Sequence, residues 1–108
     1  MIDNTLYTEL NLKSGTNKGN RRIWIEGQAL RIHGLTKGTM LSKSFEAGTR
    51  AMWLTVTDLP KFKKHSIAGT VDRPILDLCG KWVTRFMGNA ERFDAVICKG
   101  GIKITPCE

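Results

Sequence analysis

The sequence predicts a small, mostly β protein with two short helices, built as a barrel from two similar halves. One pattern occurs twice, at residues 21–56 and 72–105: a short apolar strand, a glycine, a short amphipathic helix, a second glycine and two strands. A half of this length cannot close its own core, so we expect each half to bury its apolar face against the other. The length fits one domain, residues 1–108, and closure into a barrel would remove exposed strand edges.

Residues 5–20 are predicted to form a strand and a turn ahead of the first half. Apolar and polar residues alternate over Thr5–Leu12, and Ser14–Asn20 is rich in turn-forming residues. We expect Leu6–Lys13 to pair with Arg21–Glu26 as a hairpin. Its tip would then be a basic finger carrying Lys13, Lys18, Arg21 and Arg22.

In the first half, a strand at Arg22–Glu26 leads into a short helix within Gly27–Gly34, whose final glycine is typical of a helix C-terminus. Two strands follow, Thr39–Glu46 and Arg50–Thr57, joined by a turn at Gly48. The later strand is apolar on both faces, which predicts a central position in a sheet.

The second half contains the clearest helix, Lys81–Met87, because its apolar residues form one stripe. An additional strand at His65–Val71 is predicted between the halves, after the lysine-rich segment Asp58–Lys64. The strands of the second half are predicted at Pro74–Leu78, Phe93–Cys98 and Ile102–Thr105.

The three cysteines are odd in number and lack the close spacings of metal sites, so we expect no metal. Cys79 and Cys98 occupy apolar positions of the repeated pattern, and free cysteine is commonly a small buried hydrophobe. We therefore expect both cysteines in the core, together with Trp53 and Trp82.

The charge is high and unevenly distributed. The net charge is +7, and the segment from Lys13 to Lys64 holds eleven lysines and arginines against three acidic residues. From His65 onward the chain is nearly neutral, so we expect one basic surface whose partner is a polyanion, with duplex DNA favoured. The predicted nucleic-acid-binding residues are Lys13, Lys18, Arg21, Arg22, Trp24, Arg50, Lys61, Lys63 and Lys64.

Two roles of the Trp24 side chain are equally compatible with the sequence. Trp24 alternates with Ile23 and Ile25 next to two arginines, so an exposed indole could stack on a base. The alternative is a packing residue at the end of the barrel.

The sequence contains no convincing catalytic constellation and no phosphate-binding or dinucleotide-binding loop, so we expect neither enzyme activity nor a cofactor. His33 and His65 have no acid or cysteine at a catalytic spacing, and a nucleophilic Cys79–His33 pair is much less favoured than packing. No apolar run approaches the length of a membrane span, and residues 1–10 lack a signal-peptide core. We therefore expect a cytoplasmic protein without a membrane partner.

Three short segments of the first half carry a family resemblance: Ile25–Leu30, His33–Leu35 and Lys37–Gly38. They match an apolar strand followed by G-x-x-L, a helix ending in a glycine–apolar step, and a K-G pair before the next strand. This order resembles the swapped-hairpin barrel of the AbrB, MazE and SpoVT group, and most closely its SymE-like variant. The second half keeps Gly80–Val83 and Met87–Gly88 but lacks the final glycine.

The resemblance implies a fold and a function. Members of that group usually supply one half-barrel per chain and dimerise to bind DNA, with basic residues at the start of the first strand and in nearby loops on phosphates. Two halves in one chain would make a pseudo-dimeric swapped-hairpin barrel. A similar module precedes some phage-type cytosine methyltransferase domains, which implies a recognition module of phage or mobile-element origin.

The leading hypothesis is a small DNA-binding regulator or recognition module, acting as a monomer or homodimer. A second hypothesis is a protein-binding inhibitor or counter-defence factor, because an acidic protein partner would also explain the charge. A third is a SymE-like RNA-cleaving toxin, which would depend on His33 or Arg21.

Overall fold

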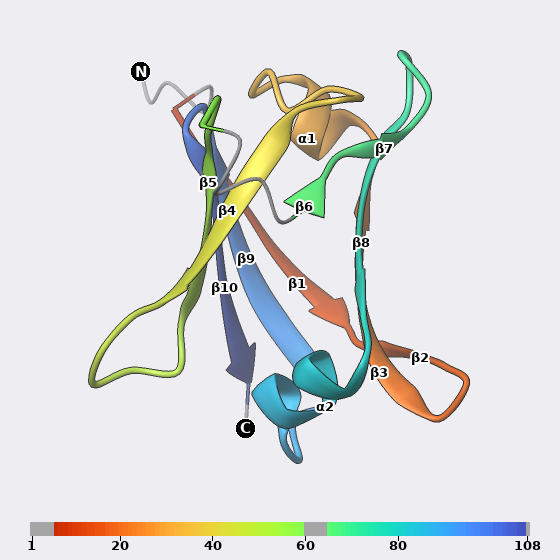
Figure 1. The fold of residues 1–108 in the computed structure, drawn as a ribbon, viewed down its shortest axis with the longest axis vertical. Helices are drawn as coiled ribbons and strands as arrows, with labels where there is room; N and C mark the ends of the chain where they lie inside the picture. The colour runs from red at the N-terminus through yellow and green to blue at the C-terminus, as the bar shows by residue number, and fades with distance from the viewer. Residues whose placement is uncertain (1–5, 60–64, 108) are drawn as a thin grey trace.

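The computed structural model describes residues 6–59 and 65–107, which form mainly antiparallel β-strands and two short helices (Figure 1). The helices are α1 (Gln28–Arg31) and α2 (Lys81–Met87). The strands are β1 (Thr8–Lys13), β2 (Gly15–Asn17), β3 (Asn20–Glu26), β4 (Met40–Phe45), β5 (Met52–Val56), β6 (His65–Ser66), β7 (Ala68–Gly69), β8 (Pro74–Cys79), β9 (Arg92–Cys98) and β10 (Gly101–Cys107).

The strands form two sheets. The large sheet has the order β1-β9-β10-β5-β4-β6, and the small sheet has the order β2-β3-β8-β7. The two long strands of the small sheet alternate as their sequences predict: Ile23 and Ile25 of β3 are buried, as are Leu76 and Leu78 of β8. These side chains form one core with the inward residues of the large sheet, so the core lies between the two sheets.

The order strand, helix and two strands occurs in both halves, and the first and last of these strands pair with the corresponding strand of the other half. β3 pairs with β8, with Ile23 opposite Leu78, and β5 pairs with β10, with Leu54 opposite Ile102. β5 is therefore central in its sheet, as predicted from its apolar residues. Gly34 (φ 78°) follows the short α1, and here Leu35 N–H donates to Leu30 O and Gly34 N–H donates to Arg31 O, the pattern expected of a glycine after a helix.

The predicted closed barrel is wrong. The chain passes from one sheet to the other at Ser14, between β1 and β2, and at Ile67, between β6 and β7, but the two sheets do not join into one ring. In the part of the chain that the structure describes, β4 pairs with β6 only at Met40 and Leu41, and β8 pairs with β7 only at Pro74 and Ile75.

The predicted hairpin is also wrong in its first strand. β1 pairs along its whole length with β9, from Thr8 opposite Ile97 to Lys13 opposite Arg92. The partner of β3 in the hairpin is instead the short β2, with Asn17 opposite Asn20. β1 joins the large sheet because its half-buried apolar residues extend the core there.

Three smaller expectations need correction. His65–Val71 is two short strands rather than one, because the chain changes sheets at the buried Ile67. Trp53 and Trp82 are half-buried rather than central, since each lies at the surface with a lysine over its ring. Cys79 and Cys98 are likewise half-buried free thiols. Among the described residues, neither helix is long and apolar enough to span a membrane.

Candidate nucleic-acid interface

Helix α2 covers one end of the molecule, at the bottom of Figure 1. Val83 and Met87 anchor it in the core between the sheets. β3 fixes its other side, because Arg21 N–H donates to Thr84 Oγ1 across 2.8 Å and Thr84 Oγ1 is 3.3 Å from Asn20 Oδ1. The first half therefore positions the helix of the second half.

Two arginines of the first half hold the C-terminal end of α2. Arg50 donates to the carbonyl oxygens of Phe86 (3.0 Å) and Met87 (3.4 Å), and Arg21 donates to the carbonyl oxygen of Ala90 just beyond the helix. The last carbonyls of a helix carry partial negative charge and lack intrahelical partners, so cationic donors stabilise them. These contacts bring guanidinium groups from β3 and from the β4–β5 turn to the same end of the molecule.

Further basic side chains gather around α2. Lys81 and Arg85 are exposed on the helix itself, and Lys43 of β4 lies with its Nζ 3.7 Å from the centre of the Trp82 ring. Arg92 starts β9 directly after the turn that follows α2, and Lys13 is opposite it in the β1–β9 register. The Arg92 guanidinium donates to the side chain and the carbonyl oxygen of Asn11 in β1. We call this surface the basic end: Lys13, Lys18, Arg21, Lys43, Arg50, Lys81, Arg85 and Arg92.

Lys18 belongs to the basic end through the β2–β3 hairpin. Lys18 (φ 54°) and Gly19 (φ 84°) form its two-residue turn, as in a hairpin whose central residues both have positive φ. The hairpin lies beside the start of α2, because Asn17 O is 4.0 Å from Cys79 Sγ, two residues before Lys81. The hairpin here therefore differs from the predicted basic finger: Lys18 lies in its turn, but Lys13 lies in β1 and Arg22 pairs with Asp77.

The structure places two of the predicted residues elsewhere. Arg22 and Trp24 lie on the outer face of the small sheet, where Arg22 forms a two-pronged ion pair with Asp77, both contacts 2.8 Å. The guanidinium also lies 4.4 Å from the centre of the Trp24 ring. The hydrogen bond that Arg22 donates to Asp77 raises the pKa of the guanidinium. This cation is thus engaged within the sheet, and Trp24 is exposed on one side only. Lys61, Lys63 and Lys64 lie outside the described residues.

Four members of the basic end were not among the predicted contact residues: Lys43, Lys81, Arg85 and Arg92. Three of them belong to the nearly neutral second half. Two of its acids are elsewhere in the fold: Asp77 pairs with Arg22, and Asp72 lies in the β7–β8 turn at the α1 end (Figure 1). Glu91, in contrast, directly precedes Arg92. The polar face of the predicted helix was the only available signal for Lys81 and Arg85.

An aromatic cluster borders the basic end. Phe45 of β4 packs on Phe86 of α2 with ring centres 6.0 Å apart, and His65 of β6 lies 5.5 Å from Trp82. Lys43 lies between them, 5.8 Å from the Phe45 ring centre as well as over Trp82. Burial lowers the pKa of Lys43, and burial together with the Lys43 charge lowers the pKa of His65.

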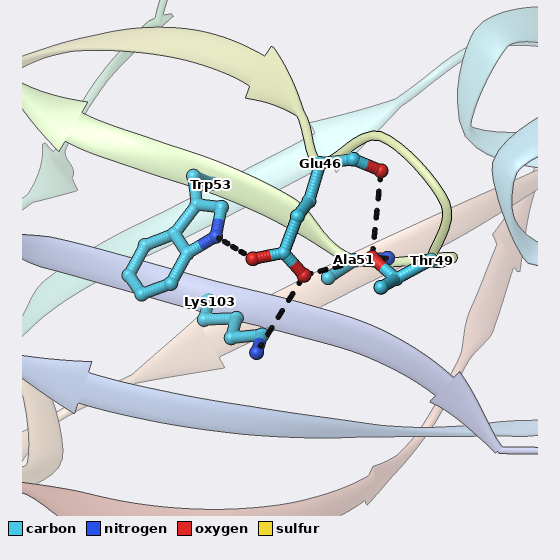
Figure 2. A network of polar contacts seen from close by, with 5 residues as sticks. All are labelled: Glu46, Thr49, Ala51, Trp53 and Lys103. Atoms are coloured by element: carbon cyan, nitrogen blue, oxygen red, sulfur yellow. Dashed lines mark hydrogen bonds and ion pairs between the residues drawn. The ribbon is translucent and has the colours of Figure 1, made fainter.

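A polar network stabilises the turn that carries Arg50 (Figure 2). The Glu46 carboxylate accepts hydrogen bonds from Thr49 Oγ1 (2.8 Å) and Trp53 Nε1 (3.4 Å), and Lys103 Nζ lies 3.9 Å away. Ala51 N–H donates to Thr49 Oγ1, which closes the turn. The hydrogen bonds from Thr49 and Trp53, and then the Lys103 charge, lower the pKa of Glu46. Arg50 therefore projects from a turn with a defined conformation.

The residues considered for catalysis do not form a site together. His33 is buried, with Nε2 2.8 Å from Thr8 Oγ1 at the α1 end. Cys79 pairs with Arg22 near the other end of β3, and Arg21 contacts the turn after α2. Within the described part of the chain, no group of three or more histidines, cysteines and acids is arranged to hold a metal ion.

Two hollows lie outside the basic end. One of about 520 Å³ lies on the outer face of the large sheet and is lined by polar residues including Glu9, Asn11 and Asp94. The other, of about 440 Å³, lies at the α1 end between Ile32, Val56 and Lys99. The carboxylates of the first make it unsuited to a polyanion.

Comparison with known proteins finds no family model, no curated protein and no solved structure that matches this chain.

Proposed function

We propose that this protein binds nucleic acid, with DNA the favoured target, through the basic end, and acts as a regulator or recognition module. The observation that carries the proposal is the convergence of cations from both halves around α2. Carboxylates also lie near these cations: Glu91 in the turn before β9, and Glu46 in the turn that carries Arg50. A surface with this charge attracts the phosphate backbone over the distance of a Debye length.

The basic end offers two kinds of cation. Arg21 and Arg50 are anchored to main-chain carbonyls and provide fixed positive charge. Lys18, Lys81 and Arg85 are exposed and can reach phosphate oxygens. Phosphate contacts provide affinity without reading the base sequence, and they release counterions, so binding should weaken steeply with salt.

The resemblance to the SymE-like swapped-hairpin group supports the same proposal. In a pseudo-dimeric arrangement, equivalent strands of the two halves are expected to pair, and β3–β8 and β5–β10 are such pairs. The loops at the start of the first strand supply phosphate contacts in that group, and Lys18 and Arg21 occupy this position here.

The test is fluorescence anisotropy with labelled DNA at low and at moderate salt. The double variant Lys81→Glu/Arg85→Glu should abolish binding at low salt. The matched control is Lys37→Glu/Lys99→Glu, which changes the net charge equally but lies at the α1 end. If both double variants lost DNA binding equally, the net charge of the protein and not the basic end would explain the loss. Wild-type binding that is absent or independent of salt would refute the proposal.

One observation favours the second function, binding to a protein. Exposed apolar side chains occur at the α1 end, where Ile32 (59% exposed) and Val56 (42%) line the 440 Å³ hollow. Larger apolar patches on a soluble protein commonly mark interaction sites. A pull-down from nuclease-treated host lysate distinguishes the two functions: a partner retained by the wild type and lost with Ile32→Lys favours protein binding.

A further inference from the structure

Phe45 occupies an unusual position for a large apolar side chain. Leu41, Lys43 and Phe45 lie on the same face of β4, and along this row the side chains are buried, half-buried and exposed in turn. β4 extends past the core, so Phe45 contacts the ring of Phe86 while it remains 59% exposed. The strand thus presents a phenyl ring to solvent beside α2.

The surroundings of this ring are cationic. Lys43 Nζ lies 5.8 Å from its centre, Arg50 donates to the main chain of Phe86, and Arg85 directly precedes Phe86 on α2. Protein–protein interface cores are depleted in charged residues, particularly lysine. Sites for single-stranded nucleic acid instead combine positive charge with aromatic rings on which bases stack. The environment of Phe45 therefore favours a nucleobase over a protein side chain.

We propose that the basic end preferentially binds unpaired nucleotides and that Phe45 is the residue on which a base stacks. This inference rests on the proposed nucleic-acid binding and adds the substrate class. In a duplex the faces of the bases are covered by their neighbours, so a surface phenyl ring has no base to stack on. In a single strand the same ring gains a stacked base, while the surrounding lysines and arginines contact the phosphates.

The test compares a labelled single strand of about 20 nucleotides with the duplex of the same sequence, by anisotropy at one salt concentration. The wild type should bind the single strand more tightly. Phe45→Ala should weaken single-strand binding about tenfold and leave duplex binding nearly unchanged. Phe45→Leu preserves an apolar contact with Phe86 but removes the aromatic face, so it should resemble the alanine variant, whereas Phe45→Trp should retain binding.

The matched control is Tyr7→Ala, because Tyr7 is similarly exposed (52%) but lies at the start of β1, near the α1 end. It should leave both affinities unchanged. Equal affinity of the wild type for both nucleic acids, or unchanged single-strand binding by Phe45→Ala and Phe45→Leu, would overturn the stacking role. If Lys81→Glu/Arg85→Glu still abolished binding in that case, the proposed function would stand without it. Wild-type protein that binds neither nucleic acid would overturn both.

Discussion

Arg50 donates a hydrogen bond to the carbonyl oxygen of Phe86 across 3.0 Å and thereby joins the β4–β5 turn of the first half to the last turn of α2 in the second. The contact connects segments 36 residues apart in the sequence. It stabilises the negative end of the helix dipole and fixes a cation on the surface proposed to bind nucleic acid. Arg50 thus contributes both to the stability of the fold and to the positive electrostatic potential of the basic end.

Arg50→Ala should lower the free energy of unfolding by about 1 kcal/mol, because the carbonyls of Phe86 and Met87 lose a charged donor. Urea denaturation followed by circular dichroism measures the change. Arg73→Ala is the control, since its ion pair with Glu26 (3.2 Å) is largely solvent-exposed and should contribute little. Equal stability of Arg50→Ala and wild type would show that the contact does not stabilise the helix.

Gly101→Ala should destabilise the protein by about 2 kcal/mol, because a Cβ at this position would lie 2.1 Å from the carbonyl oxygen of Leu54. The backbone of β5 would have to move away from β10 at the centre of the large sheet. Thermal denaturation measures the loss. Gly100→Ala is the adjacent control, because nothing lies within 4 Å of its Cβ position. A tolerated Gly101→Ala would mean that the two strands are not packed so closely.

His65 should make the protein less stable in mild acid. Burial, and then the charge of Lys43, lower the folded-state pKa of His65 below its usual 6.5. The unfolded chain therefore takes up the proton first, so this contribution to stability is complete above about pH 6.5 and is lost as the pH falls through the folded-state value.

The measurement is urea denaturation of wild type and His65→Phe at about pH 7.5 and about pH 5. The phenylalanine preserves a ring beside Trp82 and removes the titration. The wild type should lose more stability than the variant between the two conditions. The other histidine, His33, is present in both proteins, so its effect cancels. If the wild type and His65→Phe lost the same stability between the two pH values, the acid sensitivity would not come from His65.

Glu46→Gln should lower stability at neutral pH and have little effect in strong acid. Hydrogen bonds from Thr49 and Trp53, with the charge of Lys103, lower the folded-state pKa of Glu46 below its usual 4.5. The ionised carboxylate therefore contributes stability above about pH 4.5, and this contribution is lost as the pH falls through the folded-state value.

Melting temperatures of wild type and Glu46→Gln, compared at about pH 7 and about pH 3, test this expectation. The difference between the two proteins should shrink in acid, where the wild-type carboxylate is protonated. Glu91→Gln is the control, because the Glu91 side chain makes no hydrogen bond or ion pair with the described residues. A difference that is constant with pH would show that the charge of Glu46 is not what stabilises the turn.

Most elements follow from the sequence because their signals are local. The helix Lys81–Met87 has the predicted bounds, and the strands β4, β5, β8, β9 and β10 differ from the predicted ranges by two residues or fewer at each end. The cause is that alternation and the helical repeat depend only on neighbouring residues. The same patterns do not specify which strands pair, and β1 pairs with β9 rather than with β3.

The candidate site was predicted only in part, for a related reason. Lys13, Lys18, Arg21 and Arg50 were identified from a surplus of charge in the first half, and the structure brings them together. Lys43 was counted in that surplus but not identified as a contact residue. Lys81, Arg85 and Arg92 belong to a half whose positive and negative charges almost cancel. The sum conceals them because opposite charges that are close in sequence can be far apart on the surface.

By itself, the sequence determined a β-rich protein with two short helices, the order of its elements and an excess of positive charge. Each of these depends on composition or on residues within a few positions of one another. Only the tertiary structure decided that the sheets do not close into a barrel, that Arg22 is paired with Asp77, and that both halves supply cations to one end. Those outcomes depend on contacts between distant segments, where the packing of the shared core selects the partners.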